Sequence, residues 1–178
     1  MASSTSRRIG GIVTLIMITL ASAAMFIMPR VTEPPQPSAT PTPTPEQTIA
    51  YYEAIVEKNP GDKPAQLALG NAYFDKKEFA GAIKVYQAIL AIDPKDINVR
   101  VDMATAYYYE GVYPVAMTQF KKALEQDPNN VNALFNLGVV YHSLAQFKNA
   151  KEVWQKASGL ATDPKVKATI DERLKTVS

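Results

Sequence analysis

The chain repeats itself with a period of about 34 residues, and this period constrains its fold more than any other feature. Shifting the sequence by one period brings six columns of like residues into register. The columns are Gly70, Ala104 and Gly138; Tyr73, Tyr107 and Tyr141; Phe79, Tyr113 and Phe147; Ala82, Ala116 and Ala150; Tyr86, Phe120 and Trp154; and Pro60, Pro94 and Pro128. Chance does not produce so many columns, so we infer a repeated structural unit.

The residue types in these columns predict that each unit is a helical hairpin. Small residues let two helices approach closely, and large aromatic residues fill the space beside them. Proline ends the second helix, because its ring clashes with the preceding turn and it lacks an amide hydrogen. Stacked hairpins of this kind give an all-α solenoid in which each unit contacts its neighbours.

Three successive segments resemble members of the tetratricopeptide repeat family. They are LALGNAYFDKKEFAGAIKVYQAILAIDP, MATAYYYEGVYPVAMTQFKKALEQDP and NLGVVYHSLAQFKNAKEVWQKA, in units that begin at Lys63, Ile97 and Val131. The resemblance implies a tetratricopeptide helical-hairpin solenoid with repeats over residues 63–96, 97–130 and 131–164.

The resemblance weakens on both sides of these repeats. Residues 46–62 predict a lone second helix, a half-repeat that ends at Asn59-Pro60. Pro164 falls two residues late, so we expect the second helix of the third repeat to end differently. Residues 165–178 carry apolar side chains at helical spacing, which predicts a helix that caps the stack.

A long apolar segment near the N-terminus predicts a membrane anchor. Residues 9–28, IGGIVTLIMITLASAAMFIM, contain no charge, and a helix of this length spans about 30 Å, the thickness of the hydrocarbon core. Arg7 and Arg8 precede the segment, so the positive-inside rule predicts a cytoplasmic N-terminus, residues 1–8, and an extracytoplasmic repeat domain, periplasmic or at the cell surface. Ala21-Ser22-Ala23 leaves signal-peptide cleavage open as an alternative.

Residues 29–45, PRVTEPPQPSATPTPTP, predict a linker. They hold seven of the 13 prolines, and a chain so rich in proline is extended, with about 3.1 Å per residue. We therefore expect a spacer between the membrane and the repeats.

Charge and composition exclude several classes of function. Without Arg7, Arg8, Arg30 and Glu33, the 19 basic and 17 acidic side chains reduce to 16 of each, so nucleic acid is a poor partner. The chain has no cysteine and one histidine, which excludes disulfides, thiolate zinc sites and multi-histidine metal sites.

No catalytic pattern is present in the sequence, so we expect a protein that is not an enzyme and needs no cofactor or metal. The single histidine, His142, has no acid one helical turn away to orient its ring. Glycines do not cluster into a phosphate-binding loop. Asp93, Asp96 and Asp127 fall between repeats, where aspartate is an ordinary turn residue.

The family resemblance implies that the first helices of the hairpins line a concave protein-binding groove. The residues at the corresponding positions are Asn71, Phe74, Asp75, Asp102, Thr105, Tyr108, Tyr109, Phe135, Asn136, Val139 and His142, with Leu67 and Val101 expected to lie mainly in the core. Aromatic and amide groups dominate this set, and they suit an extended or helical segment of another protein.

One known use of such a groove, the two-carboxylate clamp that grips chaperone tails, is not expected here. Leu67, Asp102, Asn132 and Asn136 stand where the clamp has lysine, asparagine, lysine and arginine. The sequence thus predicts a membrane-anchored adaptor or scaffold that binds a protein or peptide, in envelope assembly or secretion. A secreted form released by cleavage and a structural unit that forms homo-oligomers remain alternatives.

Overall fold

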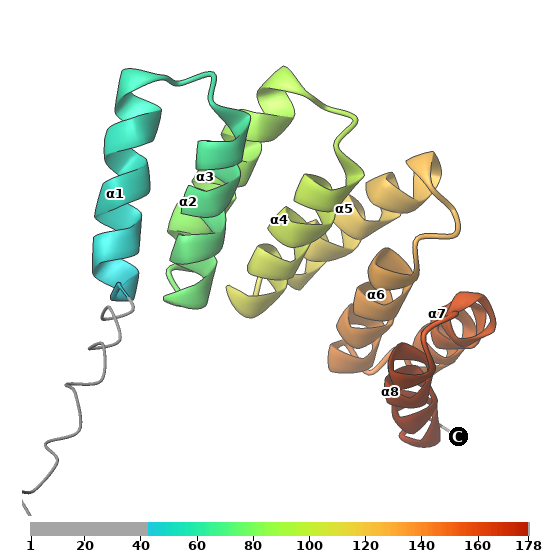
Figure 1. Cartoon of the computed structure of the whole chain (residues 1–178). Helices are drawn as coiled ribbons and strands as arrows, with labels where there is room; N and C mark the ends of the chain where they lie inside the picture. Colours follow the sequence, from blue (N-terminus) through green and yellow to red (C-terminus); the bar gives the residue numbers. More distant parts are fainter. Residues whose placement is uncertain (1–42, 178) are drawn as a thin grey trace, which may run out of the picture. The chain divides into compact units, whose positions relative to one another are not determined.

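The computed structural model describes residues 43–177, which form eight α-helices and no strand (Figure 1). The helices are α1 (Pro45–Lys58), α2 (Lys63–Asp75), α3 (Phe79–Ile92), α4 (Ile97–Tyr109), α5 (Tyr113–Gln126), α6 (Val131–Ser143), α7 (Phe147–Leu160) and α8 (Pro164–Lys175). None of these eight is long and apolar enough to cross a membrane. The predicted anchor at residues 9–28 and most of the predicted linker lie outside the described residues.

Helices α2 to α7 form three hairpins, and the start of each hairpin is set by a capping side chain. Asp62, Asp96 and Asn130 each accept a hydrogen bond from the backbone N–H three residues later, at 2.9–3.0 Å. Such a cap satisfies one of the amides left free at a helix N-terminus. The three caps are spaced by one repeat period, so α2, α4 and α6 begin in register.

The turn inside each hairpin needs a left-handed residue at the same repeat position. Lys77, Gly111 and Ala145 have φ of 64°, 82° and 56°. Glycine accepts this conformation freely, whereas a residue with a β-carbon accepts it at some cost. Only the second repeat has glycine, so the turns of the other two hairpins are strained by their sequence.

The repeat core is formed by the small and aromatic columns found in the sequence. Ala82, Ala116 and Ala150 are 0% exposed, and the rings in the aromatic column are at most 1% exposed. A β-carbon on Gly138 would lie only 2.2 Å from Trp154 Nε1, and one on Gly70 only 2.6 Å from a ring carbon of Tyr86. These two glycines are therefore required by the close approach of the ring on the second helix.

The last hairpin ends in register with the others. Helix α7 ends at Leu160, one repeat period after the end of α5 at Gln126, but it is terminated differently, as the sequence predicts. The difference lies in its C-cap, because Ala161 has φ −68° whereas Asp93 and Asp127 have φ −125° and −131°. The late Pro164 is instead the first residue of α8.

Helices α1 and α8 pack at the two ends of the hairpins. Helix α1 contacts α2, and α8 contacts α7 and buries Ile170, which is 1% exposed. In Figure 1, α8 lies in the same layer as α2, α4 and α6, while α3, α5 and α7 lie behind them. Helix α8 thus occupies the place that a further first helix would take.

Candidate functional site

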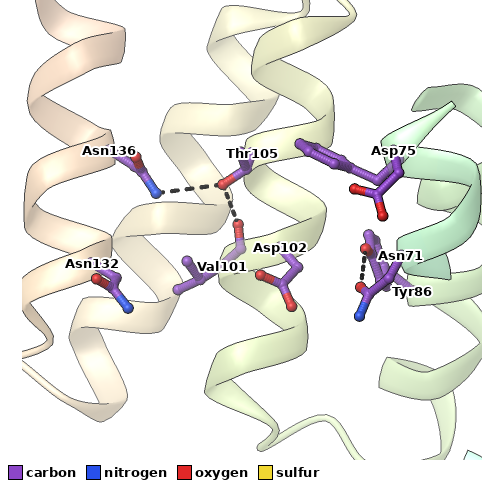
Figure 2. A pocket seen from close by; sticks show the side chains of 9 residues that line it. Asn71, Asp75, Tyr86, Val101, Asp102, Thr105, Asn132 and Asn136 are labelled. Atoms are coloured by element: carbon purple, nitrogen blue, oxygen red, sulfur yellow. Dashed lines mark hydrogen bonds between the residues drawn. The ribbon is translucent and has the colours of Figure 1, made fainter. Parts of the chain in front are cut away.

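The first helices of the hairpins line two adjoining cavities. The larger one, about 380 Å³, is called the polar cavity here and is lined by Asn71, Phe74, Asp75, Tyr86, Val101, Asp102, Thr105, Asn132 and Asn136 (Figure 2). The smaller one, about 210 Å³, is called the aromatic cavity and is lined by Thr105, Tyr108, Tyr109, Phe120, Phe135, Asn136, Val139 and Arg173. Thr105 and Asn136 line both cavities, so the two form one continuous groove.

Two side-chain amides that face the polar cavity each use only one of their hydrogen-bonding groups within the fold. Figure 2 shows the Tyr86 hydroxyl beside Asn71, where it donates to Asn71 Oδ1 at 2.8 Å. Asn136 Nδ2 donates to Thr105 Oγ1 at 3.5 Å, and that hydroxyl donates to the Val101 carbonyl at 2.8 Å. The Asn71 amino group and the Asn136 carbonyl oxygen can therefore bond the backbone of a bound peptide.

The charges of the polar cavity are all negative. Asp75 on α2 and Asp102 on α4 are its only charged lining residues, and neither forms an ion pair with a cation among residues 43–177. Burial raises the pKa of the Asp102 carboxyl, and the charge of Asp96 raises it further. Burial also raises the pKa of Tyr86, with added contributions from the negative charges of Asp102 and Asp75.

The pKa shift of Asp102 predicts that Asp102→Asn raises the melting temperature at neutral pH. Because the pKa is higher in the folded chain, the ionised carboxylate disfavours folding above the ordinary pKa of 3.8, and this penalty vanishes below it, where both states are protonated. The gain should be under about 1 kcal/mol, because water in the groove screens the charge. Thermal melts at pH 7 and about pH 3 should show a gain at the higher pH only. A variant less stable than wild type at pH 7 would contradict this account.

The aromatic cavity presents rings that are held by neighbouring rings. Tyr109 stacks on Phe79 with ring centroids 5.3 Å apart and meets Phe74 edge-on at 5.6 Å. The Tyr108 ring meets that of Tyr109 edge-on at 5.3 Å, and its hydroxyl lies 3.2 Å from Ser143 Oγ. Tyr109 remains 57% exposed. The cavity thus offers preorganised aromatic surface that a partner side chain can cover.

The structure brings together all of the predicted groove residues except one. Asn71, Phe74, Asp75, Asp102, Thr105 and Asn136 line the polar cavity, and Thr105, Tyr108, Tyr109, Phe135, Asn136 and Val139 line the aromatic cavity. His142 lines neither; its ring packs against Phe147 at 5.3 Å and Trp154 at 5.8 Å. Val101 lines the polar cavity but is only 7% exposed, and Leu67 packs against a buried cluster.

Four further lining residues were not assigned to the groove from the sequence, and one of them, Asn132, lies on the first helix α6. Tyr86 and Phe120 come from second helices, and they reach the groove beside the small residues of the first helices. Arg173 comes from α8 and is the only charged residue among the described residues that line the aromatic cavity. The predicted capping helix could have indicated this residue, because a helix that lies in the layer of first helices adds its own side chains to the groove.

The described residues contain no arrangement typical of a metal site. Within residues 43–177, no group of three or more histidine, cysteine, aspartate or glutamate side chains lies close enough to hold an ion. What the groove offers is hydrogen-bonding amides, carboxylates and aromatic surface.

Comparison with protein families relates the repeats to known sequences. Models described as tetratricopeptide repeat match residues 44–103 and 131–164, and a model described as TPR repeat matches residues 104–144. The matches together run from residue 44 to residue 164. No curated protein matches the chain in sequence.

Several solved structures share the fold at low sequence identity. TTC0263, a thermophilic TPR protein of Thermus thermophilus, has a TM-score of 0.64 at 17% identity, over 75% of this chain and 75% of that chain. PcrH, solved in complex with the chaperone-binding region of PopD, has a TM-score of 0.60 at 20% identity, over 70% and 92%. The TPR2B domain of yeast Sti1, in complex with an Hsp70 peptide, has a TM-score of 0.58 at 23% identity, over 61% and 89%.

Proposed function

The chain contains tetratricopeptide repeats from residue 44 to residue 164, and we propose that it is an adaptor that holds a segment of another protein in the groove. The repeat fold is a protein-interaction scaffold rather than a typical enzyme fold. The observation that carries the proposal is the groove itself, in which the amide groups of Asn71 and Asn136 retain bonding capacity next to the exposed ring of Tyr109.

This combination suits a peptide better than a small metabolite. Amide groups can bond a peptide backbone of any sequence, while the rings accept its apolar side chains. The two cavities adjoin along successive first helices, so an extended segment can fill both. Two of the similar structures, PcrH and the Sti1 domain, were solved with a partner segment, which supports the same role here.

Crosslinking in native cells tests the proposal. Full-length chain crosslinked in its own cells and purified under denaturing conditions should carry one recurrent partner, identified by mass spectrometry. Excess purified peptide from the crosslinked region of that partner should compete with capture. Recovery of the chain without any recurrent partner, or with copies of itself alone, would contradict the adaptor role.

We further propose that residues 9–28 anchor the chain in a membrane and that the repeats act outside the cytoplasm, in envelope assembly or secretion. The support is the uncharged length of this segment, with Arg7 and Arg8 before it and a proline-rich linker after it. The linker would let the groove meet partners at some distance from the bilayer.

If the anchor is present, alkaline carbonate should leave the full-length chain in the membrane pellet, and protease added to spheroplasts should digest the repeats from outside. A soluble mature form that begins near Ala24 would show that the segment is a cleaved signal peptide. Protection of the repeats from protease would reverse the proposed orientation.

A further inference from the structure

The two ends of the groove carry opposite charge. The polar cavity has Asp75 and Asp102 as its charged residues, whereas the aromatic cavity has Arg173. A segment that lies along the groove therefore meets negative potential at α2 and α4 and positive potential at α8. Charge arranged in this way selects both the composition and the direction of a bound segment.

The two carboxylates of the polar cavity are not neutralised by any cation in the part of the chain that the structure describes. Asp75 and Asp102 come from successive first helices, and neither pairs with a cation among residues 43–177. By contrast, Asp93 and Asp96 between the first two repeats both pair with Lys63, at 2.9 and 2.8 Å. The half-buried Asp102 carboxylate without a cation is unfavourable for folding, so it is more easily explained by a ligand than by stability, and the exposed Asp75 lines the same cavity.

We propose that the polar cavity binds a lysine or arginine side chain of the partner segment between Asp75 and Asp102, with an apolar side chain of the same segment in the aromatic cavity. This inference rests on the adaptor role proposed above. Figure 2 shows Asp102 on the middle helix, with Asp75 and Asn71 on one side and Asn132 and Asn136 on the other. The carboxylates bind the cation while the amides bond the adjacent backbone.

The same helix positions argue against an acidic segment. The lining of the polar cavity has two carboxylates and no cation, so none of its residues would pair with an acidic side chain. An acidic side chain there would face two carboxylates at close range, which costs binding energy. A divalent cation fits less well than a basic side chain, because the cavity has only two carboxylates and no group of three or more histidine, cysteine, aspartate or glutamate side chains within residues 43–177 could hold an ion.

Selection from a library of random twelve-residue peptides displayed on phage tests the inference. The full-length chain, immobilised in mild detergent, should retain peptides in which lysine or arginine is enriched over aspartate or glutamate about fivefold or more, as for a partly exposed ion pair. Asp102→Lys should reverse this preference toward acidic residues. Asp75→Lys, at an exposed position, should shift the preference in the same direction and gives the same readout where Asp102→Lys does not fold.

The matched control is Glu125→Lys, which reverses an exposed charge on α5 outside both cavities and should select the same peptides as wild type. Peptides that lose retention on Tyr108→Ala, yet show no basic preference in wild type, would overturn this inference and leave the adaptor role standing. The absence of any enriched peptide would contradict both.

Discussion

A chain with alanine in place of Gly138 should unfold about 10 °C or more below wild type. The new β-carbon would lie 2.2 Å from Trp154 Nε1, 2.5 Å from Cδ1 and 2.7 Å from Cε2. The indole cannot move aside, because it is 1% exposed and its N–H donates to the Phe135 carbonyl at 2.9 Å. Overpacking costs about 1–3 kcal/mol or more, and a broken buried hydrogen bond costs about 1–3 kcal/mol.

These costs exceed the benefit that alanine brings to a helix, which is about 1 kcal/mol. The expected net loss of about 3 kcal/mol corresponds to the melting shift above. Gly138→Leu, with a larger branched side chain, should lose more. Thermal melts followed by circular dichroism measure both variants.

Gly159→Ala makes the same chemical change in α7 at a position with no neighbouring atom within 4 Å of the new β-carbon. It should leave the melting temperature unchanged or raise it slightly. A melt of Gly138→Ala that overlaps wild type would show that Gly138 and Trp154 do not pack as described.

The second large effect concerns partner binding. Tyr108→Ala and Phe135→Ala should each weaken the affinity for the crosslinked partner about 30-fold, because truncation of an aromatic anchor commonly costs about 2 kcal/mol or more. Both rings line the aromatic cavity. Isothermal titration of each purified full-length variant with the partner segment measures the loss.

Folding must be separated from binding in this experiment. Phe135 also contacts the core, with its ring 6.5 Å from that of Trp154, so its truncation should lower the melting temperature somewhat. Titrations should therefore be made at a temperature at which circular dichroism shows each variant folded. Lys122→Glu changes an exposed charge on α5 and should bind as wild type does. A loss of affinity in Lys122→Glu and in neither aromatic variant would place the binding site on the face formed by the second helices.

The repeat architecture could be predicted because its constraints are local and recur. A small residue and an aromatic ring each have a fixed place in the repeat unit, as Gly138 and Trp154 show. Residues that satisfy a packing constraint in each repeat form columns in the sequence. The left-handed turns at Lys77 and Ala145 form no such column, because neither residue is glycine.

The groove residues could be predicted less fully, because side chains on the same face of a helix can either line the groove or pack against neighbouring helices. His142 occupies a groove position, yet its ring packs against Phe147 and Trp154 instead of lining a cavity. Arg173 was not predicted to line the groove, because the sequence of α8 departs from the repeat pattern. The unpaired state of Asp102 depends on which cations reach it in three dimensions, and spacing along the chain does not reveal that.

The most direct test of the groove as the binding site is photocrosslinking at single positions. A benzophenone amino acid placed at Tyr109, which is 57% exposed in the aromatic cavity, should crosslink to the partner in native cells. The same amino acid at Lys122, exposed on α5, should not. Partner crosslinks at Lys122 and none at Tyr109 would contradict the account and place the partner on the second helices.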